Sequence, residues 1–255
     1  MSKTFVLRPF GLLTIFYLLF FLISCSSSPK LTDNLKANKE SIKRIGSMNL
    51  LDHTVALAPI EKELSSQKID EKKERLIDIN SNNLSDKLIE VFQANQVFKK
   101  IEKLSGDNTS KKTQIQGARD KKSSLLMNIT VKKAKVYCAG ANNSALGNTA
   151  MWFLLGIPSL WGADTNYGVE IVADVSFFDI ASSPDFATLV YSYECPFKVE
   201  GGLSYFERSS SMAVLAMPPQ FCPDNLDKVK ESVLPLAQEQ FLLKLAEMTK
   251  EKLGK

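Results

Sequence analysis

The sequence has little of what enzyme and metal sites are built from. His53 is the only histidine among 255 residues, and the short motifs of serine hydrolases, phosphate-binding loops and dinucleotide-binding folds do not occur. The four cysteines lack the spacing of metal ligands. Carboxylate pairs such as Glu61 with Glu63, and Glu71 with Glu74, lie in charge-rich stretches that are typical of solvated surfaces. We therefore expect no catalytic residue, no metal and no cofactor.

The apolar run near the N-terminus is short of the ~20 residues that a membrane-spanning helix needs. Lys3 and Arg8 precede an uncharged stretch from Phe10 to Ile23. The stretch closes at Leu22-Ile23-Ser24-Cys25, which resembles a bacterial lipobox. The resemblance implies that residues 1–24 are a signal peptide and that Cys25 carries diacylglycerol and acyl chains such as palmitate. An ordinary cleaved signal and an uncleaved membrane helix are the alternatives.

A net charge of +4, of which Lys3 and Arg8 are lost with the signal peptide, excludes a nucleic-acid partner. Residues 25–50 hold few large apolar side chains, so we expect a lipidated cysteine followed by a disordered tether. Residues 51–255 then form a single domain. Ser26 after the cysteine, in place of Asp, is consistent with outer-membrane sorting in bacteria that use the aspartate rule.

The first half of the domain mixes strands with one clear helix. The apolar run Thr54–Ile60 predicts a buried strand that ends at its proline. An N-cap and apolar residues at helical spacing predict a helix over 84–92, and residues 96–101 indicate a second strand. The charged residues 61–78 suggest an exposed helix or mobile segment, and residues 105–120 suggest a polar loop.

The second half alternates apolar and polar side chains. Residues 125–136 predict one strand. Its alternating apolar side chains are at odd positions as far as Val131 and at even positions from Ala134, so a bulge is required near Lys132-Lys133. Residues 167–177 and 189–199 alternate cleanly around a turn, which predicts an antiparallel hairpin. A last helix opens near Asp224-Asn225 and is bent or restarted at Pro235.

This order of elements resembles a group of envelope lipoproteins: the curli secretion lipoproteins, the lipoprotein activators of peptidoglycan synthases and the N-terminal domain of the Tol-Pal translocation protein. The likeness rests on Val55-Ala56-Leu57-Ala58-Pro59-Ile60, on the helix that leads into Val97-Phe98-Lys99-Lys100-Ile101, and on Val172-Ala173-Asp174-Val175-Ser176-Phe177-Phe178-Asp179. It implies an α/β (α+β) sandwich, with a mixed, mostly antiparallel sheet and helices packed on one face.

The long insertion 138–166 departs from the small members of that group. Between Lys135 and Asp164 the chain has no charged residue, and its centre, Met151–Trp161, holds both tryptophans. The candidate contacts with a partner or a membrane are Trp152, Phe153, Leu154 and Trp161. The alternative is that this stretch packs on the core of its own domain.

Three cysteines remain after lipidation of Cys25. Cys195 shares the parity of Tyr193 and Phe197, which predicts a buried free thiol on the core face. Cys138 and Cys222 lie at the edges of apolar loops and form our candidate disulfide, although Cys138 with Cys195 is equally near.

We expect a non-catalytic binding or adaptor module of the cell envelope, anchored to the membrane by lipid, with the outer membrane favoured and an envelope protein as partner. The alternative is a subunit of an oligomeric outer-membrane secretion assembly, since the predicted hairpin alternates as transmembrane strands do. A carboxylate-based envelope hydrolase is the weaker alternative, because carboxylates can converge from distant segments.

Overall fold

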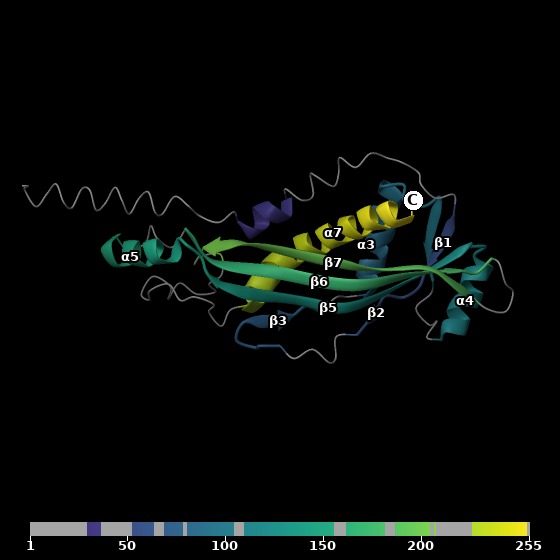
Figure 1. The fold of residues 1–255 in the computed structure, drawn as a ribbon, viewed down its shortest axis with the longest axis horizontal. Helices are drawn as coiled ribbons and strands as arrows, with labels where there is room; N and C mark the ends of the chain where they lie inside the picture. The colour runs from purple at the N-terminus through teal and green to yellow at the C-terminus, as the bar shows by residue number, and fades with distance from the viewer. Residues whose placement is uncertain are drawn as a thin grey trace, which may run out of the picture.

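Three long strands organise the fold (Figure 1). The structure, a computed structural model, describes residues 30–36, 53–63, 69–78, 81–104, 110–155, 162–181, 187–204, 207 and 226–253. The elements run in the order β1 (Thr54–Leu57), β2 (Glu61–Lys62), β3 (Glu74–Leu76), α3 (Ser81–Ala94), β4 (Lys100–Lys103), α4 (Lys111–Asp120), β5 (Leu125–Ala141), α5 (Ala145–Leu155), β6 (Ala163–Asp179), β7 (Thr188–Ser204) and α7 (Leu226–Leu253).

The sheet has seven strands in the order β4-β1-β5-β6-β7, and β2 and β3 also pair with β5. Strands β5, β6 and β7 have 17 residues each and are antiparallel, so they extend for about 55 Å. β1 runs parallel to β4 and β5. The predicted fold class, including the hairpin, is therefore confirmed. The predicted bulge is present as well, as a register shift between Val131 and Lys133.

Helices α3 and α7 cover one face of this sheet, which we call the covered face. In α3 the buried side chains Leu84, Leu88 and Phe92 recur every four residues, as the sequence predicts. In α7 the helix continues through Pro235, which lies on its exposed side. Both helices share one hydrophobic core with the inward residues of β5, β6 and β7, among them the fully buried Tyr167.

Several stretches differ from the prediction. The strand predicted over residues 96–101 begins only at Lys100, as β4. Residues 61–78 form no helix where they are described: β2 and β3 pair with one edge of β5, and strands of two and three residues are too short to show a period. Residues 110–120, expected as loop, form the capped helix α4, in which the Ser110 side chain accepts from the Thr113 amide. Helix α4 buries few apolar residues, in a small second cluster with Leu126 and Ile180.

The expectation of a tether that is disordered throughout 25–50 is wrong for residues 31–36, which form a short helix. Leu31 and Leu35 are fully buried in the main core, and Lys30 forms a β-bridge with Gly202 on β7. Gly201 permits this approach, because a Cβ there would lie 2.4 Å from the Leu31 backbone. Leu31 and Leu35 are four residues apart and so lie on the same side of the helix, which lets both reach the core. Residues 1–29, with Cys25 and the lipobox, and residues 37–50 lie outside the described residues.

Candidate functional site

Helix α5 is carried at one end of the long strands, between β5 and β6 (Figure 1). Two buried or half-buried amides fix it there. The Asn142 side chain donates to the Ala163 carbonyl at 3.0 Å, and the Asn148 side chain donates to the Gly162 carbonyl at 3.0 Å. The predicted insertion 138–166 thus consists of the end of β5, this helix and the start of β6, with residues 156–161 outside the described part.

One side of α5 projects large apolar side chains into water. Leu146 is 83% exposed, Phe153 is 70% exposed and Leu154 is 60% exposed. At 100° per residue these three side chains fall on a single stripe of the helix, which we call the α5 stripe. Trp152 lies off this stripe and is half-buried, with its ring edge-on to Phe153 at 5.1 Å between centroids.

The structure therefore separates the four sequence candidates. Phe153 and Leu154 are exposed, so the alternative of packing on the domain's own core is wrong for them. Trp161 lies outside the described residues. Leu146 was missed, although it precedes Phe153 and Leu154 by seven and eight residues, a spacing that puts it on the same stripe. The contact of the stripe with a membrane or partner stays a prediction.

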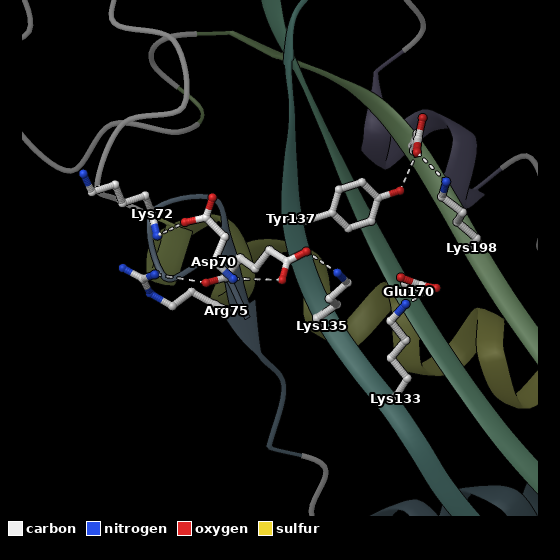
Figure 2. Close-up of polar contacts among 10 residues, drawn as sticks. Asp70, Lys72, Arg75, Lys133, Lys135, Tyr137, Glu170 and Lys198 are labelled. Atoms are coloured by element: carbon white, nitrogen blue, oxygen red, sulfur yellow. Dashed lines mark hydrogen bonds and ion pairs between the residues drawn. The ribbon is translucent and has the colours of Figure 1, made fainter. Parts of the chain in front are cut away.

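The second feature is the face of β5, β6 and β7 opposite α3 and α7, which we call the open face. Because side chains alternate along a strand, the residues between the core positions all point to this side. They are mostly charged: Lys133, Lys135 and Tyr137 on β5, Glu170 and Asp174 on β6, and Glu194, Lys198 and Glu200 on β7. Figure 2 shows how closely Lys133, Glu170, Tyr137 and Lys198 lie across the three strands.

Tyr137 crosses the width of the open face. In the strand register Tyr137 pairs with Gly168, and Gly168 pairs with Glu200. A Cβ on Gly168 would lie 2.4 Å from the Tyr137 ring, so only glycine lets the ring pass over β6. The Tyr137 hydroxyl donates to the Glu200 carboxylate. This hydrogen bond and Lys198, 3.0 Å away, lower the pKa of Glu200, whereas burial and Glu200 raise the pKa of Tyr137.

Ion pairs tie the rest of the open face together. Lys133 donates to Glu170 at 2.7 Å, Lys132 pairs with Asp174, and Lys135 pairs with Glu74 from β3. The Lys135–Glu74 pair is the least exposed of these, with side chains 15% and 19% exposed. Sequence reasoning assigned Glu74 to a solvated helix, because nothing local indicates that β3 pairs with β5.

The described part of the chain shows no cluster of metal-ligating side chains. Within it, no group of three or more His, Cys, Asp or Glu side chains lies close enough to hold a metal ion. His53 is exposed, with its Nδ1 3.2 Å from the Ser124 hydroxyl. None of the helices among the same residues has the length and apolar character that crossing a membrane requires.

The structure tests the predictions for two of the cysteines, Cys138 and Cys195. Cys195 is free and fully buried, as predicted, and burial raises its thiol pKa to about 12. Cys138 is disulfide-bonded. Because Cys195 is free, the alternative pairing of Cys138 with Cys195 is wrong. Cys222 lies outside the described residues, and its pairing with Cys138 stays a prediction.

Comparison with known proteins gives only distant structural likenesses. No protein-family model and no curated protein matches the sequence. The hypothetical protein CT253 from Chlamydia trachomatis aligns at 9% identity over 64% of this chain and 77% of that one, with a TM-score of 0.33. A PelC dodecamer from Paraburkholderia phytofirmans aligns at 10% identity over 65% and 82%, with a TM-score of 0.30. Lipoprotein GNA1162 from Neisseria meningitidis aligns at 9% identity over 72% and 99%, with a TM-score of 0.29. Similarities with TM-scores this low support no statement about function.

Proposed function

We propose that this chain is a lipid-anchored, non-catalytic binding module of the bacterial cell envelope. It is held at the membrane, with the outer membrane favoured, by Cys25, and it binds another envelope protein on the open face. The observation that carries the proposal is the open face itself, a broad surface of three paired 17-residue strands that no helix in the described part of the chain covers. Its charges of both signs suit a protein partner of complementary pattern and not a polyanion.

The electrostatics of the open face support binding over acid–base chemistry. A general acid needs a carboxyl group whose pKa is raised toward neutrality. On the open face Glu170 and Asp174 pair with lysines, and the pKa of Glu200 is lowered. A carboxylate whose pKa is lowered stays charged at neutral pH, so Glu200 is suited to forming an ion pair with a partner.

Photo-crosslinking in cells tests this proposal. A photoreactive amino acid at the exposed Glu194 on the open face should yield one crosslinked envelope protein, whereas the same amino acid at the exposed Gln93 on α3 should yield none. Reversing an open-face charge with Lys198→Glu should abolish the crosslink without altering expression. Equal amounts of crosslinked protein from Glu194 and Gln93 would contradict a specific binding surface on the open face. Labelling of the wild type with palmitate, absent in Cys25→Ser, tests the anchor separately.

A second candidate, a subunit of an oligomeric secretion assembly, is favoured by the edge of the sheet. In the described part of the chain, the outer edge of β7 pairs only with Lys30, through one bridge. Such a long edge is a template for a strand from another copy. Pro196 and the charges of β7 oppose pairing, since proline lacks the amide donor and edge charges repel a second strand. Stable oligomers of the detergent-solubilised chain would favour this candidate, and a monomer would favour the first.

A further inference from the structure

The α5 stripe is the largest group of exposed apolar side chains on one described element, and no charge accompanies it. Leu146, Phe153 and Leu154 are each at least 60% exposed. From Val136 to Ala163 the sequence contains no Asp, Glu, Lys, Arg or His. A protein interface would normally carry charged residues at its rim. An exposed apolar surface accompanied by tryptophan matches the boundary between lipid headgroups and acyl chains, where tryptophan is enriched.

The docked N-terminal segment lies at the same end of the molecule as α5. Lys30 forms its bridge with Gly202, two residues and about 7 Å of strand from Ser204. Ser204 pairs with Ala163, the residue whose carbonyl holds the base of α5. The Glu207 carboxylate connects the two sides: it pairs with Lys30 at 3.2 Å and accepts from the Ser204 amide at 2.8 Å. A continuous set of contacts therefore joins Lys30 to the base of α5.

The length of chain before Lys30 sets how far this end can be from the lipid. Cys25 precedes Lys30 by five residues, which span at most about 18 Å when fully extended. Helix α5 has 11 residues and is about 16 Å long, a comparable distance. A lipid group on Cys25 thus holds the α5 end, and not the end with β1, β4 and α4, against the bilayer (Figure 1).

We propose that the α5 stripe inserts into the interface of the bilayer that anchors Cys25, as a second membrane contact. The inference rests on the lipid anchor of the proposed function. Two contacts at one end fix the orientation, which a single lipidated residue on a free tether would leave undetermined. The opposite end of the long strands then stands about 55 Å from the membrane, with the open face accessible from the side.

The two native tryptophans, both within residues 152–161, report on this contact without any added label. The full, lipidated chain is reconstituted into phosphatidylethanolamine–phosphatidylglycerol vesicles with or without bromine on the acyl chains, which quenches only nearby tryptophan. Brominated vesicles should reduce the fluorescence of the wild-type chain. The variant Phe153→Asp with Leu154→Asp should lose that quenching while still floating with the vesicles.

Leu189 and Val190 provide a matched control, because they are also adjacent, apolar and exposed, by 53% and 58%, at the other end of β7. Leu189→Asp with Val190→Asp should keep wild-type quenching. If the wild-type chain floats with the vesicles but its tryptophan fluorescence is not quenched, the inference is overturned and the lipid anchor stands. Quenching that survives Phe153→Asp with Leu154→Asp, or a detergent-stable dimer that these substitutions abolish, also overturns it. A chain that is neither lipidated nor floats overturns the proposed function and the inference with it.

Discussion

The covered face and the open face of β5, β6 and β7 differ in their exposure to water. On the covered face, residues such as Val169, Ile171 and Phe197 are buried in the core that the strands share with the helices. On the open face, the residues between them form partly exposed ion pairs, such as Lys133 with Glu170 and Lys198 with Glu200. Apolar burial is the main source of stability, and exposed ion pairs contribute little. The covered face therefore holds the fold, and the open face is available for the partner that we propose.

The largest expected effect is the loss of an aromatic ring from the core of the covered face. Phe241 on α7 is 1% exposed and packs edge-on against Phe197, with centroids 6.3 Å apart. Phe241→Ala should lower the free energy of unfolding by about 3–5 kcal/mol, because it leaves a cavity in the core. Phe153→Ala on the α5 stripe, the same chemical change, should stay within about 0.5 kcal/mol. Denaturant unfolding of both variants checks the contrast, and comparable losses would show that the stripe is part of the core.

The core of the covered face extends to the docked helix 31–36, which the substitution Gly201→Ala should detach. In Gly201→Ala the new methyl group would lie 2.4 Å from backbone atoms of Leu31, so the helix must move and expose Leu31 and Leu35. Overpacking of this kind lowers the free energy of unfolding by about 1–3 kcal/mol. Amide hydrogen exchange should accelerate across residues 31–36 and stay unchanged in α3.

Gly140→Ala is the control for that experiment. A Cβ at Gly140 would meet nothing within 4 Å, and its φ of +103° costs only local backbone strain. Exchange in residues 31–36 should therefore match the wild type. Acceleration in Gly140→Ala as well would mean that the helix is released by general loss of stability and not by the close contact at Gly201.

The contrast between faces also explains what the sequence could predict. The hairpin, the bulge at Lys132-Lys133, α3 and the buried free Cys195 follow from hydrophobic periodicity, and periodicity records which side chains face the core. Strands β2 and β3 are too short for a period, and α4 buries too few apolar residues to show one. Helix 31–36 depends on only two leucines within a polar stretch.

The open face is hidden from sequence reasoning for a different reason. Tyr137, Gly168 and Glu200 become neighbours only when the register of three strands is known, and a shift of one residue in either strand pair would separate them. Glycine in a strand also indicates a bulge as readily as a close side-chain approach. Composition predicts a polar face, but not which residues on it touch.

Gly168→Ala tests that three-strand contact. The added methyl group would lie 2.4 Å from the Tyr137 ring, which must swing away and lose its hydrogen bond to Glu200. The ring can move into water, so the loss should be about 1 kcal/mol, less than for Gly201→Ala. In a Tyr137→Ala background the clash is absent, and Gly168→Ala should become neutral or stabilising because alanine restricts the unfolded chain. A thermodynamic cycle of the four proteins measures this coupling, and additive effects would contradict it.

The smallest effect concerns the ionisation of Glu200 on the open face. Its pKa is lowered below the ordinary 4.5, first by the hydrogen bond from Tyr137 and then by Lys198. A carboxyl group with a lowered pKa adds stability above its ordinary pKa, and that contribution disappears as the pH falls through the folded-state pKa. The stability difference between wild type and Glu200→Gln should therefore be present at neutral pH and vanish in acid. In a carboxyl NMR titration the Glu200 midpoint should lie below 4.5 and rise toward it in Tyr137→Phe, which keeps the ring and removes only the donor. An unchanged midpoint would mean that Lys198 alone sets the charge at this position, and the contact that joins β5 to β7 would then be packing of the ring over Gly168 without its hydrogen bond.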